Sequence, residues 1–206
     1  EKGINKKRAG RLFFCNVIFG LLSYSLLKTL RKITMQRFIK IISESTETHI
    51  ENFNRIENLI HEELQQSGST RLVINLQKMR WERAIFVIGL FSLFEAVIQN
   101  ELKIEKGSAF KELKIKLARD KSEELLVRFE DFYHAINVLK HGKGHSYTKL
   151  LEKQDSLPFE ITPADSSFRN EGDVSEIETL IYVDDKFLKS CLAVICQCYE
   201  ELFRIK

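Results

Sequence analysis

The chain has 206 residues, 44% of them hydrophobic and 30% charged, and this composition excludes a disordered chain and fits an ordinary globular domain. The formal net charge is +3. Eight basic residues and one acidic residue precede residue 35, so residues 35–206 carry a net charge of −4. The main part of the chain therefore gives no global electrostatic reason to expect nucleic-acid binding, which would need a local basic patch.

Sixteen uncharged and mostly apolar residues occupy positions 12–27. As a helix they would span roughly 24 Å, less than the ~30 Å hydrocarbon core of a bilayer, and no A-x-A-like cleavage site of a signal peptide follows them. Three interpretations of the extension at residues 1–34 stay open: a stretch without a native role, a membrane-proximal interfacial helix, or a packed helix. We expect a cytoplasmic protein, which would be membrane-associated if residues 12–27 are native.

Only 2 prolines and 9 glycines interrupt the chain, which predicts a mostly helical fold. Residues 43–66 are expected to form an amphipathic helix with Ser43, Ser45 or Thr46 as its N-cap. The longest predicted helix covers residues 71–103. Its centre, residues 84–94, is apolar on every side but too short to cross a bilayer, so we expect it to be the central helix of a bundle.

Three more helices are predicted at residues 108–119, at 123–140 and from the Asp184-Asp185 N-cap to about residue 205, and residues 147–153 add one or two turns. Both prolines lie in residues 154–175, which have a loop composition. The segments 159–162 and 179–183 are rich in β-forming residues. The sequence thus predicts an all-α, up-and-down helical bundle at residues 35–206, with a possible small two-stranded β ribbon before the C-terminal helix.

The four cysteines are Cys15, Cys191, Cys196 and Cys198. On one helix the last three would point near 0°, 140° and 340°, at about 100° per residue, so they do not converge on one metal ion. The paired spacing of a zinc site is also absent from the sequence. We therefore expect reduced cysteines that pack as small apolar residues in a cytosolic protein.

The helix at 123–140 and the loop after it have the composition of a site. Its apolar residues fall within a sector of about 80°; they are Leu125, Phe129, Phe132, Ile136 and Leu139. On the opposite side, a polar stripe of about 120° is formed by Asp131, His134, Asn137 and His141. The stripe leads into Gly142-Lys143-Gly144 and then His145-Ser146-Tyr147. Two imidazoles and an amide beside a glycine-rich loop predict a functional site.

The stripe favours acid–base chemistry over metal binding. His134 and His141 are two turns apart, roughly 10.5 Å along the axis, whereas ligand bonds are near 2 Å long, so they cannot share one ion. Residues 142–144 lack the rest of a phosphate-binding glycine loop. A single imidazole titrating near neutral pH suits His141 as general acid or base. The structural alternatives are a helix-ending role for Gly142 and a dipole-capping role for His141.

The sequence has a short motif at the end of this helix: Asn137, three intervening residues, His141 and then a glycine. Within a helical bundle of this size, this motif resembles that of the HEPN superfamily. These helical domains occur among toxin and defence ribonucleases and RNA-processing proteins. The resemblance covers roughly residues 40–205 in architecture and residues 136–147 in motif. The family motif begins with an arginine directly before the Asn position, and here that position holds Ile136, which belongs to the predicted buried face.

The resemblance implies a metal-independent endoribonuclease without cofactors, in which the arginine stabilises charge on the scissile phosphate while the histidine helps to activate the ribose 2′-hydroxyl. It also implies a homodimer that brings two stripes together, and an antitoxin or other protein partner. His141 and Asn137 are then the expected catalytic residues. The expected contacts to RNA and phosphate are Lys140, Lys143, His145, Ser146, Tyr147 and His134.

The missing arginine leaves two hypotheses. The first hypothesis is RNA binding with weakened cleavage, because loss of one electrostatic contact to a transition state typically lowers the rate by about 10² to 10³. Lys140 or Lys143 could replace the cation, although an ammonium lacks the forked geometry of a guanidinium. The second hypothesis is a non-catalytic helical protein-interaction module, in which residues 137–147 form a rigid corner between a helix and a loop.

Overall fold

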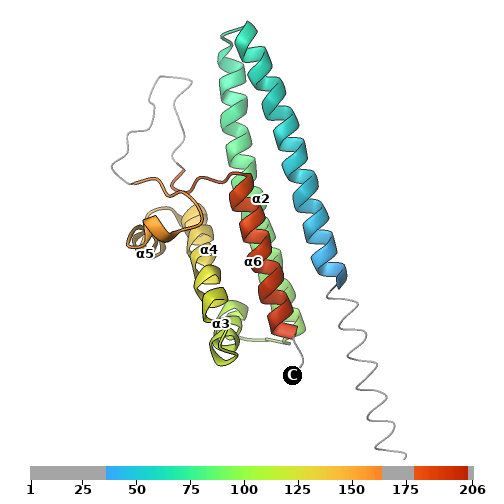
Figure 1. The fold of residues 1–206 in the computed structure, drawn as a ribbon, viewed down its shortest axis with the longest axis vertical. Coiled ribbons are helices and arrows are strands. Elements are labelled where there is room, and N and C mark those ends of the chain that lie inside the picture. Colours follow the sequence, from blue (N-terminus) through green and yellow to red (C-terminus); the bar gives the residue numbers. More distant parts are fainter. Residues whose placement is uncertain (1–35, 164–178, 204–206) are drawn as a thin grey trace, which may run out of the picture. The chain divides into compact units, whose positions relative to one another are not determined.

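The computed structural model describes residues 36–163 and 179–203 (Figure 1). The chain divides into two compact units, residues 1–41 and residues 42–206, whereas the predicted boundary followed residue 34. The apolar segment at 12–27 and Cys15 lie outside the described residues. The candidate site and the hydrophobic core both belong to the second unit.

A helix covers residues 36–66, and its part in the second unit, residues 42–66, runs antiparallel to α2 (Thr70–Glu101) as a hairpin (Figure 1). Its two arms are joined by a hydrophobic cluster of Phe53, Ile60 and Met79, with Leu64, Leu72 and Leu76 packed against it. The predicted N-cap near residue 43 was wrong, because the helix continues through it. Thr46 Oγ1 instead donates a hydrogen bond of 2.7 Å to the carbonyl of Ile42, one turn earlier in the same helix.

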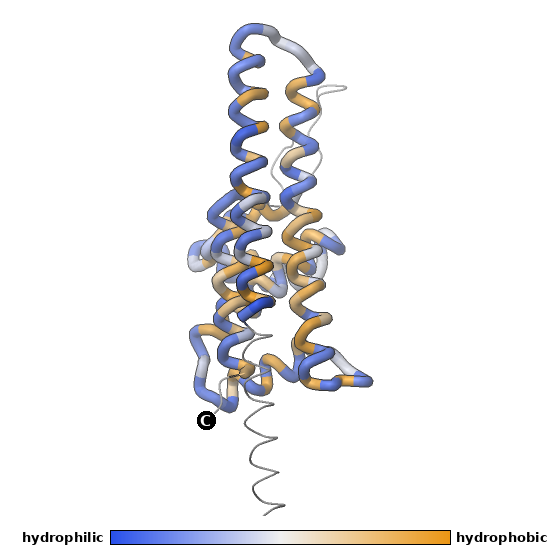
Figure 2. Tube along the Cα trace, turned by 90° about the vertical axis from the view of Figure 1, so that its right-hand side faces the viewer, coloured by the Kyte–Doolittle hydropathy of each residue, from blue (hydrophilic) through white to orange (hydrophobic). Residues whose placement is uncertain are grey.

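Helices α3 (Ala109–Arg119), α4 (Glu123–His141) and α6 (Asp185–Phe203) pack against α2 and against one another. This confirms the predicted all-α helical bundle. The part of α2 inside the bundle is predominantly hydrophobic (Figure 2). Aromatic rings fill the space between α2, α3 and α4, with centroid distances of 5.0 Å between Phe91 and Phe110 and 5.3 Å between Phe110 and Phe129.

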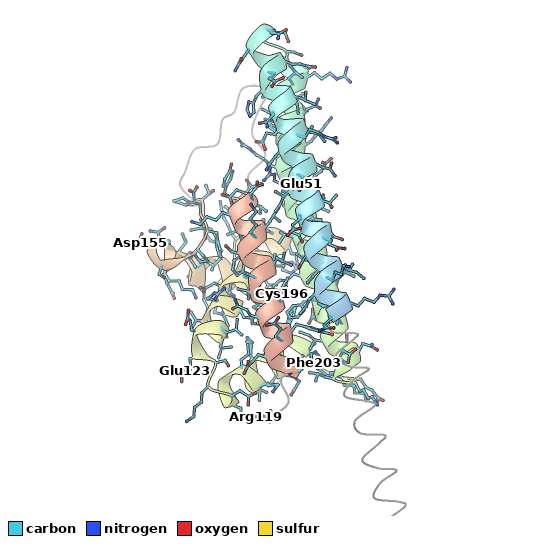
Figure 3. All side chains as sticks on the ribbon, turned by 45° about the vertical axis from the view of Figure 1, so that its right-hand side comes forward. Glu51, Arg119, Glu123, Asp155, Cys196 and Phe203 are labelled. Atoms are coloured by element: carbon cyan, nitrogen blue, oxygen red, sulfur yellow. The ribbon has the colours of Figure 1, made fainter. Side chains whose placement is uncertain are left out.

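The C-terminal helix α6 begins where the sequence predicts. The carboxylate of Asp184 accepts a hydrogen bond of 2.7 Å from the backbone N–H of Phe187, as an N-cap does. Cys191 and Cys198 are free thiols buried on this helix, and burial raises the pKa of Cys198 to about 12. Cys196 lies midway along α6 and is half-buried (Figure 3). Cys191 and Cys198 therefore pack as apolar residues.

The loop before α6 contains one antiparallel bridge, between Ile161 and Ile181. Its two backbone hydrogen bonds are 2.8 Å, from the N–H of Thr162 to the carbonyl of Leu180, and 3.2 Å, from the N–H of Tyr182 to that of Glu160. Within the described residues the predicted two-stranded ribbon is thus reduced to a single bridge. Prolines at positions 158 and 163 bracket the first segment and carry no N–H for a longer ladder.

A buried arginine joins three helices. The guanidinium of Arg83 on α2, whose side chain is 8% exposed, donates hydrogen bonds to Asp185 (2.6 Å), Asn54 (3.0 Å) and Glu57 (3.1 Å). Asn54 also donates to the other oxygen of Asp185 at 2.6 Å, and the ring of Phe53 lies 5.2 Å from the guanidinium carbon. Because its members bond one another, we infer that this cluster is structural.

Candidate functional site

Helix α4 and the short helix α5 (His145–Leu151) meet at a sharp bend, called here the α4–α5 corner and defined as residues 134–153. Gly142 ends α4 with φ 71° and ψ −145°, and its N–H donates a hydrogen bond of 2.8 Å to the carbonyl of Val138. A residue with a Cβ atom would strain the backbone at this φ and ψ. The sequence-based prediction of a helix-ending glycine at this position is therefore confirmed.

The substitution Gly142→Ala is expected to destabilise the protein by about 1–3 kcal/mol, because the backbone there is one that residues other than glycine rarely adopt. Gly144→Ala is the matched control. Gly144 has φ 173°, an extended backbone that any residue adopts, and a Cβ there would meet no atom within 4 Å. Thermal denaturation of both variants measures the difference, and equal stability of the two would contradict this role for Gly142.

Four predicted site residues are exposed at the corner: Lys140, His141, Lys143 and His145. Lys149 on α5 is exposed beside them. Three exposed lysines and the exposed Glu152 give this surface a local charge of +2 with neutral histidines, since Lys153 is paired with Asp131, in a chain that is otherwise acidic after residue 34. The local basic patch that nucleic-acid binding would need is therefore present at this surface.

His134 has a different environment from His141. It is half-buried, and a hydrogen bond of 3.0 Å joins its Nδ1 to Ser146 Oγ on α5. Burial lowers the pKa of His134, and Lys149 lowers it further, while Glu130 opposes the shift. A neutral imidazole is no counter-ion for phosphate, so we infer that His134 and Ser146 hold α5 against α4.

Asp131 and Tyr147 are structural residues in this fold. Asp131 was predicted on the exposed stripe, but it is 5% exposed and forms an ion pair with Lys153. Tyr147, predicted to contact RNA, is 5% exposed, and its hydroxyl donates a hydrogen bond of 2.8 Å to the carbonyl of Thr162. The reason is that α5 packs on α4 and covers part of the stripe, which the pattern of one helix does not reveal.

Ile136, at the position of the family arginine, is 3% exposed. Its side chain belongs to the core between α4 and its neighbours, as the helical pattern predicts. This position therefore cannot supply the cation of the HEPN motif, because a charged side chain here would be buried.

Asn137 and Lys140 line a small cavity of about 120 Å³ between α2, α3 and α4. The remaining lining residues are Phe91, Ser92, Glu95, Phe110, Tyr133 and Ile136. His141 follows one turn after Asn137 on α4. The structure thus brings the Asn137 side chain to a cavity and leaves that of His141 on the open surface next to it. The partners of Asn137 on α2 and α3 could not be predicted from the pattern of α4 alone.

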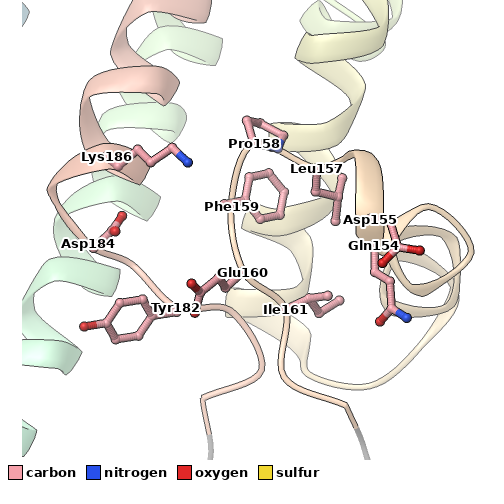
Figure 4. Close-up of a pocket in the computed structure, with 10 residues that line it drawn as sticks. All are labelled: Gln154, Asp155, Leu157, Pro158, Phe159, Glu160, Ile161, Tyr182, Asp184 and Lys186. Atoms are coloured by element: carbon pink, nitrogen blue, oxygen red, sulfur yellow. The ribbon is translucent and has the colours of Figure 1, made fainter.

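A larger cavity of about 400 Å³ lies between the start of α6 and the segment after α5 (Figure 4). It is lined by Gln154, Asp155, Leu157, Pro158, Phe159, Glu160, Ile161, Tyr182, Asp184 and Lys186. The Lys186 side chain extends from α6 toward Pro158 (Figure 4). All the predicted site residues lie outside this lining.

The described residues contain no group of three or more His, Cys, Asp or Glu side chains placed to hold a metal ion. Among these residues, no helix has the length and hydrophobicity needed to cross a bilayer. The fold defines the chain as an all-α helical bundle protein. In comparisons with family models, with curated proteins and with solved structures, nothing matches this chain.

Proposed function

We propose that this protein is a HEPN-like RNA-binding domain with weak, metal-independent ribonuclease activity, of the type found in toxin and defence systems. The observation that carries the proposal is the α4–α5 corner, where two exposed imidazoles, His141 and His145, lie among exposed lysines. Lysines neutralise phosphates and release counter-ions, which supplies most of the affinity of sequence-independent RNA binding. Imidazoles beside a bound phosphate can transfer protons near neutral pH.

In this proposal His141 acts as the general base that removes the proton of a ribose 2′-hydroxyl, whose oxygen then bonds to the adjacent phosphorus. The bond from phosphorus to the 5′-oxygen breaks, and water gives the leaving oxygen a proton. Lys140 and Lys143 contact the phosphate, in place of the family arginine. An ammonium stabilises developing charge as a point charge and lacks the two parallel hydrogen bonds of a guanidinium. Asn137 orients the RNA from the neighbouring turn of α4. Cleavage is expected to be slow because one contact to the transition state is weakened.

RNA binding by the wild-type protein tests the first half of the proposal. For single-stranded RNA, the logarithm of the affinity is expected to fall with the logarithm of the salt concentration by roughly 0.7 for each phosphate contact. Contacts by Lys140, Lys143 and Lys149 would give a slope of about −2. Fluorescence anisotropy of a labelled RNA over a series of salt concentrations measures this slope. Binding that is absent at low salt, or indifferent to salt, contradicts the proposal.

The exposed face of α2 supports an interaction with a second copy of this chain. Trp81, Ile85, Gly89 and Leu93 follow one another at intervals of four residues and form a single stripe. Trp81 is 41% exposed, and Ile85 and Leu93 are each 62% exposed. The prediction that α2 is covered all round is therefore wrong for the described part of the chain. We propose that this stripe is the interface of a homodimer, with Gly89 allowing close approach.

Charged side chains in this stripe are expected to separate the dimer. The double variant Ile85→Glu, Leu93→Glu should elute as a monomer in size-exclusion chromatography with light scattering, because burying unpaired carboxylates in the interface is costly. Ile115→Glu with Val127→Glu is the matched control, since both residues are 52% exposed but lie on α3 and α4. A monomeric wild-type protein would contradict the dimer, and persistence of the dimer in the first variant would place the interface elsewhere.

A further inference from the structure

The small cavity beside the corner has a chemical lining that suits one kind of ligand. Its floor is formed by Phe91, Phe110 and Ile136, which are 2%, 4% and 3% exposed. Ser92 and Lys140 are the exposed residues of its lining, so the cavity opens to the surface beside them. The ring of Tyr133 lies 5.9 Å from that of Phe110 and adds to the apolar wall. A flat, partly apolar ligand would therefore enter from the surface next to His141.

The size of the cavity limits what fits. Sites for drug-sized ligands enclose roughly 300–1,000 Å³, whereas this cavity encloses about 120 Å³. It has room for a single flat ring system but none for an attached sugar and phosphate. If a nucleobase enters, its ribose and phosphate stay outside at the mouth, beside Lys140 and the exposed His141.

Three polar side chains line the cavity without a protein partner. In the part of the chain that the structure describes, the side chains of Glu95, Asn137 and Lys140 make no hydrogen bond or ion pair with the protein. They offer a carboxylate, an amide and an ammonium from two different helices. Glu95 and Asn137 are half-buried and Lys140 is exposed, so all three side chains are accessible to a ligand that enters the cavity. Three such groups around one cavity, over an apolar floor, form an incomplete hydrogen-bonding set.

Guanine completes this set better than the other bases. Its Watson–Crick edge carries two adjacent donors, N1–H and the 2-amino group, which match the two oxygens of Glu95. The O6 acceptor matches the amide N–H of Asn137, and Lys140 stays at the cavity's edge for the phosphate of the same nucleotide. Adenine, cytosine and uracil each lack this pair of adjacent donors. An unstacked base bound through its polar edge against apolar rings is also the usual mode of single-strand RNA recognition.

We propose that this cavity is a guanine-binding subsite of the RNA-binding surface, with Glu95 as the residue that determines specificity. The inference rests on the proposed function, since it takes the guanine from RNA held at the α4–α5 corner. Glu95 comes from α2, a helix that the sequence did not connect with the site. The subsite would place the nucleotide attached to the bound guanine next to His141.

Anisotropy of labelled single-stranded RNAs tests this subsite. The probes are an oligouridine and the same oligomer with one central guanine, adenine or inosine. A bidentate pair discriminates between bases by about 10-fold or more, so the guanine probe should bind about 10-fold more tightly than the others. Inosine lacks the 2-amino group and should lose that gain. Glu95→Gln, which keeps the shape but not the two acceptor oxygens, should abolish the preference and leave oligouridine binding unchanged.

Glu124→Gln is the matched control, because Glu124 is an exposed glutamate at the opposite end of α4. It should keep the guanine preference. Equal binding of all probes by the wild-type protein overturns the subsite and leaves the proposed RNA binding intact. Binding of none of them overturns both. Preference for GMP over AMP in a titration, without any guanine preference among the RNAs, would assign the cavity to a free guanine nucleotide and overturn its role in RNA recognition.

Discussion

Arg83→Ala is expected to lower the free energy of unfolding by about 2–3 kcal/mol. The substitution removes the guanidinium but leaves Asp185, whose side chain is 30% exposed, without its 2.6 Å partner. It also removes donors to Asn54 and Glu57 on the helix at 36–66. Breaking a buried pair by deleting one member costs more than the pair contributes, because the remaining charge is uncompensated.

Arg128→Ala is the control for this prediction. Arg128 lies on α4 and makes an exposed hydrogen bond of 3.2 Å to Gln197, so its loss should change stability by less than about 0.5 kcal/mol. Urea denaturation followed by circular dichroism measures both variants. If the free energy of unfolding of Arg83→Ala lies within about 1 kcal/mol of that of the wild-type protein, the cluster does not hold the hairpin to α6.

Local features of the fold could be predicted from the sequence. The N-cap at Asp184, the glycine that ends α4 and the burial of Ile136 each depend on a few neighbouring residues. The bounds of α3, α4 and α6 agree with the predicted ones within two residues. Spacing at 3.6 residues per turn determines which side of an amphipathic helix is buried.

Features that depend on more than one helix could not be predicted. The Arg83 cluster combines residues separated by 29 and 102 positions, and a single arginine before an apolar run gave no sign of it. The position of Glu95 beside the cavity of Asn137 could not be predicted either, because the two residues lie on different helices. Apolar residues all round α2 suggested a covered helix, but composition alone does not distinguish burial by the same chain from burial by a partner.

The largest effect on activity is expected for His141→Ala. General acid–base catalysis by one side chain typically contributes about 10² to 10⁴ in rate. Since His141 is exposed, its replacement should leave the melting temperature and the salt-dependent RNA affinity nearly unchanged. His61→Ala is the matched control, because His61 is an exposed histidine on the helix at 36–66, outside the corner.

The rate of cleavage of a labelled RNA, measured in the presence of EDTA, tests the proposed role of the corner most directly. Wild-type protein and His61→Ala should cleave at equal rates, and His141→Ala at least about 10²-fold more slowly. EDTA binds the metal ions that contaminating metal-dependent nucleases need, and it should leave the rate of the wild-type protein unaffected. Equal rates for wild type and His141→Ala, or cleavage that EDTA abolishes, would contradict a ribonuclease site at His141.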